Sequence, residues 1–121
     1  MSRLILVVDD EELLLELTSS LLEDIGCKVR TATGGAAALA TLAAEPSIVM
    51  MITDVQMPLM NGYELAERAH ALRPDLRIVL MSGNDQGREG YTFLRKPFQE
   101  TQLSGIVQSI VGDNVVGATT R

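Results

Sequence analysis

Five polar side chains stand at or just beyond the ends of segments that have the length of β-strands. They are Asp9, Asp10, Asp54, Ser82 and Lys96. A carboxylate can act as a nucleophile or bind a hard cation, and an ammonium group can neutralise nearby negative charge. Each residue alone would be ordinary, because acidic residues often cap the helices that follow strands, as Asp10 or Glu11 could here. All five together at one place would instead form a reactive site.

The segments that precede these residues predict a parallel β-sheet. Leu4–Val8, Ile48–Ile52 and Ile78–Met81 are continuous apolar runs, which are typical of strands buried on both faces. Lys28–Ala32 and Tyr91–Arg95 are mixed in composition, as strands at the edges of a sheet are. Amphipathic segments separate the runs, so strand and helix alternate along the chain. This pattern predicts an α/β fold with strand order 2-1-3-4-5 and helices on both faces of the sheet.

Such a sheet would bring the polar residues to one edge, because sites form at the carboxyl ends of parallel strands. Neighbouring strands lie about 4.8 Å apart. Asp9 and Asp10 from the first strand would therefore come within several ångströms of Asp54 from the third. Like charges that close repel one another unless a cation offsets them. Mg²⁺ bound to the carboxylates, or the ammonium of Lys96, would do so.

Leucine spacing and glycine or proline boundaries predict the helices. The first helix carries Leu13, Leu14, Leu17, Leu21 and Ile25 along its apolar face, and Gly26 follows as a stop signal. Further helices are expected at Gly35–Glu45, Gly62–Leu72 and Glu100–Val111, with Gly112 as a cap. Gly62 is also expected to permit an unusual backbone angle before its helix.

Leu15 and Leu22 lie one heptad apart on the first helix, about 100° around from its main apolar face. Two interpretations of this pair stay open. The leucines could belong to a broad buried arc, or they could form an exposed strip to which a partner's helices dock.

The connection between the fourth and fifth strands is short. Nine residues, Ser82 to Gly90, join the two strands, and three of them are glycines. A parallel crossover that contains a helix needs at least about 10–12 residues. We therefore expect the helix at this point to be missing or reduced to one turn, with a mobile loop in its place.

Charge and composition narrow the class of protein. The chain has 16 acidic and 10 basic residues, a net charge of −6, which disfavours direct binding of nucleic acid. Cys27 is the single cysteine and is expected to be a buried small hydrophobe. No apolar run is long enough to insert into a membrane, so a cytoplasmic protein is expected. Residues 1–112 are expected to form one domain, and residues 113–121 a flexible tail.

Four motifs carry a resemblance to a known family. The stretches Val7–Glu11, Asp54–Gly62, Met81–Gly83 and Lys96–Phe98 resemble the signature motifs of two-component response-regulator receiver domains. The resemblance runs in order from about Leu4 to Val111 and implies a flavodoxin-like fold, like that of chemotaxis regulators. The short fourth connection and the run Phe93–Phe98 are similar to receivers of hybrid histidine kinases. A single-domain regulator and a receiver from a larger protein are both compatible with the chain.

The resemblance implies a role for each acidic residue. Asp54 would be the phosphoacceptor, whose carboxylate attacks a phosphohistidine and becomes an aspartyl phosphate. Asp10, Asp54 and the backbone carbonyl of Gln56 would bind Mg²⁺, for which Mn²⁺ is an alternative, and Asp9 would act through water. The protein would then mainly position the phosphoryl group and screen its charge.

The resemblance also implies how the phosphorylated state is recognised. Ser82 would hydrogen-bond one phosphoryl oxygen and Lys96 would pair with another. Phe93 occupies the position of an aromatic switch residue, and a permanently buried core ring is the alternative interpretation. Gln56 and Asn84 stand where the family tunes the lifetime of the phosphoryl group. Pro97 would follow a cis peptide bond.

These roles define the expected partners. A histidine kinase or a histidine phosphotransfer domain would supply the phosphoryl group, and a downstream protein that the sequence does not identify would respond to it. The chain would catalyse its own phosphorylation without being a free-standing enzyme. A phosphorylation-independent interaction module is one alternative. A phosphohydrolase with an Asp nucleophile is another, although Asp54 lacks a second carboxylate two residues later.

Overall fold

A five-stranded parallel sheet forms the centre of the molecule, in the order β2-β1-β3-β4-β5. The computed structural model describes residues 3–84 and 90–109. The strands are β1 (Leu4–Val8), β2 (Lys28–Ala32), β3 (Ile48–Asp54), β4 (Arg77–Ser82) and β5 (Thr92–Arg95). The predicted fold class and strand order are therefore confirmed.

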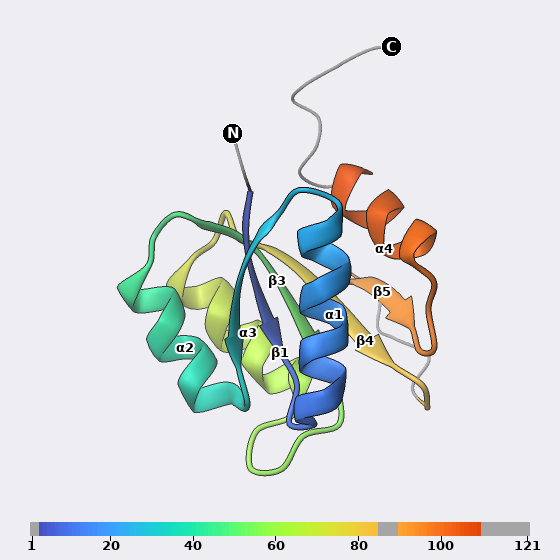
Figure 1. Ribbon diagram of the computed structural model, residues 1–121. Helices are drawn as coiled ribbons and strands as arrows, with labels where there is room; N and C mark the ends of the chain where they lie inside the picture. The colour runs from blue at the N-terminus through green and yellow to red at the C-terminus, as the bar shows by residue number, and fades with distance from the viewer. Residues whose placement is uncertain (1–2, 85–89, 110–121) are drawn as a thin grey trace.

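Two pairs of helices cover the sheet, one pair on each face (Figure 1). The helices are α1 (Glu12–Asp24), α2 (Gly35–Ala44), α3 (Gly62–Leu72) and α4 (Glu100–Val107). Helices α1 and α4 lie on one face, and α2 and α3 lie on the other. Beyond Val107, a wider π-helical turn continues to Ser109. The predicted end of this helix at Val111 and its cap at Gly112 lie outside the described residues.

Alternating side chains of β1 fill the two cores. Leu4, Leu6 and Val8 pack with residues of α2 and α3. Ile5 and Val7 point to the opposite face and pack with residues of α1 and α4. All five side chains are buried, as expected for a central strand covered on both sides.

The face that α1 buries agrees only in part with the face predicted for it, since Leu21 and Ile25 of the predicted face pack partly buried against the core. Leu15 is 6% exposed and Leu22 is 0% exposed, whereas Leu13 is 80% and Leu17 is 55% exposed. Leu15, Thr18 and Leu22 form the buried stripe, with the spacing i, i+3, i+7 of one helix face. The hypothesis of an exposed docking strip at Leu15 and Leu22 is therefore wrong, and the buried-arc alternative is confirmed. Because leucines occupy most sides of α1, the sequence pattern does not determine which side of the helix faces the sheet.

The described residues contain no helix between β4 and β5. Gly83, Asn84, Gly90 and Tyr91 are the described part of this connection, and all four are non-helical. The expected absence of a helix is borne out for these residues. The predicted mobile loop falls mainly on residues 85–89, which lie outside the described part of the chain. The tail predicted at residues 113–121 and the domain boundary at 112 also lie outside it.

Two further expectations concern single residues and the membrane. Cys27 is buried in the core beside α1, as predicted. Among the described residues, none of the helices has the length and apolar character needed to cross a bilayer.

Candidate functional site

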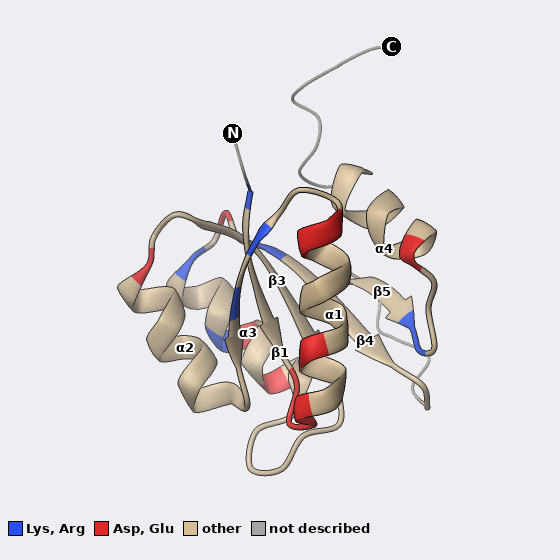
Figure 2. Cartoon of the chain, in the orientation of Figure 1, with Lys and Arg blue, Asp and Glu red and all other residues tan. Residues whose placement is uncertain are grey.

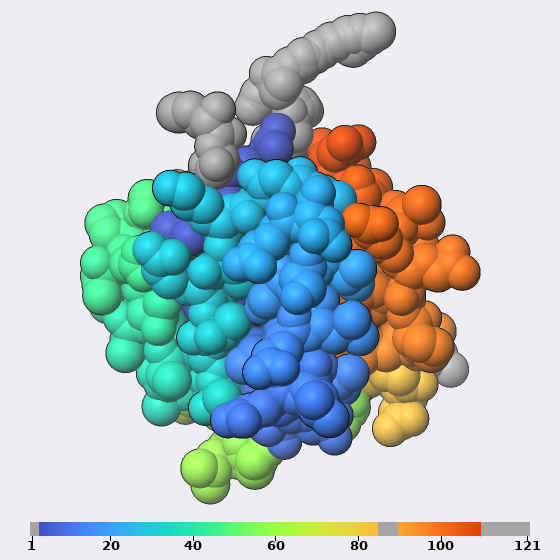
Figure 3. Space-filling view, viewed as in Figure 1, coloured from blue at the N-terminus to red at the C-terminus, as the bar shows by residue number. Residues whose placement is uncertain are grey.

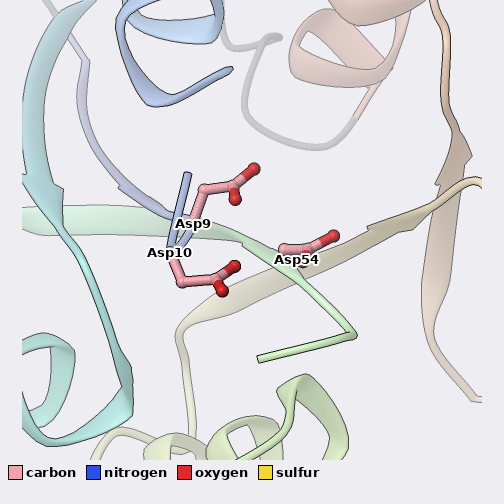
Figure 4. Close-up of side chains that lie close together, drawn as sticks. All are labelled: Asp9, Asp10 and Asp54. Atoms are coloured by element: carbon pink, nitrogen blue, oxygen red, sulfur yellow. The ribbon is translucent and has the colours of Figure 1, made fainter. Parts of the chain in front are cut away.

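Three carboxylates gather where β1 and β3 end. Asp9 and Asp10 directly follow β1, and Asp54 is the last residue of β3. The strand register aligns these ends, because Val8 of β1 lies opposite Thr53 of β3. One carboxylate oxygen from each residue lies within 4.8 Å of the other two (Figure 4). The structure thus brings together the three acidic residues that the sequence placed at this edge.

Lys96 reaches the same point from the end of β5. Its Nζ lies 3.0 Å from Oδ1 of Asp54 and 3.4 Å from Oδ2 of Asp9. Its backbone N–H donates to the carbonyl oxygen of Ser82 at 3.0 Å, which extends the pairing of β4 with β5. The following Lys96-Pro97 peptide bond is cis, as the resemblance implied. The ammonium group is therefore held between two of the carboxylates.

Burial makes this cluster electrostatically unusual. Asp9 and Asp54 are 1% and 5% exposed, while Asp10 is exposed. Burial raises the pKa of the Asp54 carboxyl, the hydrogen bond and charge of Lys96 oppose the rise, and the charges of Asp9 and Asp10 add to it. Burial by itself lowers the pKa of Lys96, but Asp54 and Asp9 outweigh it and the pKa is raised overall. The ammonium thus stays charged, yet it only partly balances three carboxylates.

The donor set at this site fits a hard divalent cation. All three side chains offer carboxylate oxygens, which Mg²⁺ and Mn²⁺ prefer over nitrogen or sulfur. Asp9 is oriented by the backbone N–H of Glu11, which donates to its Oδ1 at 3.0 Å. The exposed Asp10 leaves one side open to solvent. Figure 2 places other acidic residues of the β1–α1 connection and the start of α1 beside this end of the sheet.

Comparison with known proteins decides the family. The model of the response regulator receiver domain matches residues 5–108 of this chain. The chain belongs to the response regulator receiver domain family. The response regulator receiver protein CpdR of Brucella abortus is 39% identical over 120 residues, which cover 92% of this chain and 98% of that protein.

Receivers are found in proteins of different sizes, and two further comparisons illustrate this. The sensor histidine kinase GacS of Pseudomonas protegens is 35% identical over 127 residues, covering 89% of this chain but only 13% of the kinase. The crystal structure of a receiver domain protein from Clostridium thermocellum superimposes with a TM-score of 0.84 at 28% identity, covering 90% of this chain and 94% of that one. The chain thus spans only a small part of this sensor kinase but nearly all of the receiver protein CpdR.

Ser82 lies at the end of β4, beside the acidic cluster of the receiver. Asp54 pairs with Met81 across β3 and β4, so Ser82 is one residue beyond that pair. Its Oγ donates to Oε1 of Gln56 at 2.7 Å and accepts the backbone N–H of Asn84 at 3.1 Å. Motif reasoning placed Ser82 and Gln56 at the site, but it missed the contact between their side chains. No spacing rule signals such a contact, since it depends on two rotamers.

The loop between β3 and α3 begins directly after Asp54 and projects from this end of the molecule (light green in Figure 3). Gly62 does not have the unusual backbone angle expected for it, since the described glycines with positive φ are Gly26 and Gly90. In this loop the positive φ is at Leu59, at 70°. Gly62 is required for space instead. An added Cβ would meet the carbonyl oxygen of Asp54 and lie 2.8 Å from Cα of Val55.

Phe93 is only partly buried. It pairs with Leu80 across β4 and β5 and packs against the core cluster that contains Leu80. The guanidinium of Arg95 lies 5.8 Å from the ring centroid. The ring thus packs at the border of the core, and the alternative of a permanently buried core ring stays a prediction. The switching role of Phe93 stays a prediction. His70 is exposed on α3.

Proposed function

We propose that this receiver accepts a phosphoryl group from a phosphohistidine onto Asp54, in a Mg²⁺-dependent reaction that changes its contacts with other proteins. The observation that carries the proposal is the 3.0 Å contact of Lys96 with Asp54 inside a cluster of three carboxylates. An ammonium at that distance can pair with a phosphoryl group as soon as Asp54 carries one. The reaction makes the chain a self-catalysed acceptor rather than a free-standing enzyme.

The transfer is a displacement at phosphorus. A carboxylate oxygen of Asp54 forms a bond to phosphorus while the bond between phosphorus and the donor's imidazole nitrogen breaks, and the electron pair stays on that nitrogen. Asp10, Asp54 and the backbone carbonyl of Gln56 would hold Mg²⁺, and Asp9 would act through water. The bound cation would neutralise the charge of the phosphoryl oxygens. Lys96 supplies the remaining positive charge. Ser82 donates its hydroxyl to a phosphoryl oxygen after the transfer.

A histidine kinase or histidine phosphotransfer domain is the proposed donor. The similarity to the sensor histidine kinase GacS supports this class of partner. Leu13 and Leu17 provide an apolar surface for docking, since they are 80% and 55% exposed and lie in the half of α1 that begins beside Asp10. An exposed apolar pair next to a reactive site is typical of a binding surface. The downstream partner would recognise the phosphorylated state.

Acetyl phosphate tests the proposal without a cognate kinase. The purified protein is incubated with acetyl phosphate and Mg²⁺, and intact mass spectrometry measures the fraction that gains one phosphoryl group. We expect modification of the wild type and of Asp24→Asn, a matched exposed aspartate at the far end of α1. We expect none in Asp54→Asn, and none when a chelator removes Mg²⁺. Modification that persists in Asp54→Asn would reject Asp54 as the acceptor.

A further inference from the structure

The hydroxyl of Ser82 already has specific partners in the unphosphorylated receiver. It donates to the carboxamide oxygen of Gln56 at 2.7 Å, the usual length of a good O–H···O bond. It also accepts the backbone N–H of Asn84, two residues ahead, at 3.1 Å. Ser82 is 0% exposed, whereas Gln56 is exposed. A residue at the surface therefore orients a buried hydroxyl beside the acceptor strand.

The backbone of Ser82 is fixed independently of this contact. Its carbonyl oxygen accepts from the N–H of Lys96 at 3.0 Å, and Ser82 pairs with Arg95 across β4 and β5. The hydroxyl can therefore change partners by rotating about the Cα–Cβ bond, between staggered rotamers, without any movement of the strand.

The position of Gln56 is likewise set by the sheet. The N–H of Val55 donates to the carbonyl oxygen of Met81 at 3.0 Å, which carries the pairing of β3 with β4 one residue past Asp54. Gln56 follows directly, so its side chain starts beside the end of β4. The carboxamide of Gln56 and a phosphoryl group on Asp54 thus approach the same hydroxyl from neighbouring positions on one segment.

We propose that the Gln56 side chain is a positioning residue that holds the Ser82 hydroxyl in its resting orientation and competes with the phosphoryl oxygen for it. This inference rests on the proposed function and adds to the site a second hydrogen-bond acceptor, the carboxamide oxygen of Gln56, that competes for the Ser82 hydroxyl. Rotation of the hydroxyl away from Gln56 also removes the acceptor of the Asn84 N–H. The contact therefore links the state of Asp54 to the residues that follow β4.

Binding of beryllium fluoride in the presence of Mg²⁺ tests the competition. The apparent affinity is measured by ¹⁹F NMR for the wild type, Gln56→Met, Ser82→Ala and the double variant. Because one competing hydrogen bond is lost, Gln56→Met should bind beryllium fluoride roughly two- to tenfold more tightly than the wild type does. This gain in affinity should disappear when Ser82 is also replaced, so that the double variant binds beryllium fluoride no more tightly than Ser82→Ala alone. Gln108→Ala removes an exposed amide just beyond the last residue of α4 and should bind beryllium fluoride like the wild type.

A second readout needs neither metal nor phosphoryl mimic. Amide exchange of Asn84 in the unliganded protein should be faster in Gln56→Met than in the wild type, because the hydroxyl that accepts its N–H is no longer oriented. Gln56→Ala should behave in the same way, and thermal melts check that both variants are folded.

Three outcomes would overturn the inference alone: unchanged or weaker binding in Gln56→Met, an equal gain in the Ser82→Ala background, or unchanged exchange at Asn84. These results leave the proposed function standing, provided that the wild type binds beryllium fluoride and Asp54→Ala does not. Failure of the wild type to bind would reject the proposed function, and the competition with it.

Discussion

The ammonium of Lys96 contacts two buried carboxylates at once, at 3.0 Å from Asp54 and 3.4 Å from Asp9. One positive charge cannot balance those two groups and the nearby Asp10 as well. The raised pKa of Asp54, caused first by burial and reinforced by its acidic neighbours, is the electrostatic sign of this deficit. A divalent cation bound as proposed would share the neutralisation of the site with Lys96, and the ammonium would weaken the binding of that cation.

Removing the ammonium should separate metal binding from phosphoryl binding. We expect Lys96→Met to bind Mg²⁺ more tightly, by on the order of fivefold, because about 1 kcal/mol of repulsion between cations disappears. The same variant should take up less phosphoryl group from acetyl phosphate, since its charge-assisted contact is lost. NMR titration measures the first effect and intact mass the second. Lys28→Met, an exposed lysine on β2, is the control, and weaker Mg²⁺ binding by Lys96→Met would contradict the shared role.

Cys27 leads to a prediction about alkaline pH. Burial raises the pKa of its thiol, with Arg3 partly opposing the rise. A raised pKa in the folded state means that the unfolded chain loses this proton first. The contribution of the thiol to stability is thus complete below the unfolded value of about 8.5 and is lost as the pH rises through the folded value. In urea melts, the difference in stability between wild type and Cys27→Ala should shrink above about pH 8.5. A constant difference would show that the thiol does not titrate with folding.

At the scale of elements, helix α1 has one face that packs against the sheet and another face that exposes leucines to solvent. Its buried stripe of Leu15, Thr18 and Leu22 anchors it to the sheet and to α4. Its exposed leucines, Leu13 and Leu17, make no comparable contribution to the core, because 80% and 55% of their surfaces face solvent. Packing therefore accounts for the first set, and the proposed docking of a histidine partner would account for the second.

Substitutions on the two faces of α1 should have opposite consequences. Leu13→Ser with Leu17→Ser should leave stability and acetyl phosphate labelling nearly unchanged, while slowing transfer from a phosphorylated histidine partner. Leu22→Ala should instead lower the free energy of unfolding by about 2–5 kcal/mol, as large-to-small changes in a core do. Chemical denaturation and partner-dependent transfer rates distinguish the two effects. Normal transfer by the double serine variant would remove this docking surface from the proposal.

The β3–α3 loop depends on the absence of a side chain at its end. Gly62→Ala would place a Cβ 2.8 Å from Cα of Val55, and backbone cannot move away as a flexible side chain can. We expect a loss of about 1–3 kcal/mol of stability, the usual cost of overpacking. Gly105→Ala in α4 is the matched control, since nothing lies within 4 Å of its added Cβ and alanine favours helices. Equal stability of the two variants in urea melts would contradict the steric account.

At the scale of the whole molecule, the sequence was sufficient to predict the features that the pattern of apolar and polar residues along the chain determines. Continuous apolar runs identified the buried strands, and their order placed Asp9, Asp54 and Lys96 at one edge. The buried face of α1 was predicted only in part, because leucines occupy most sides of that helix and only tertiary packing selects the buried one. The contact between Gln56 and Ser82 depends on side-chain rotamers, which no local spacing encodes. The sequence pattern thus predicted the topology of the fold but not the geometry of individual side chains.

Mg²⁺ should stabilise the folded molecule through the same convergence of β1 and β3. A ligand that binds only the folded state raises its stability by about 2.7 kcal/mol at a hundred times its dissociation constant. The unfolded chain has no such site, because Asp54 is far along the chain from Asp9 and Asp10. We therefore expect thermal melts of the wild type to shift upward with Mg²⁺ and to return when a chelator is added. Asp10→Asn should lose most of the shift, and since Asp10 is exposed, the variant should still fold. Asp24→Asn should keep the full shift, and an equal shift in Asp10→Asn would mean that the ion binds elsewhere.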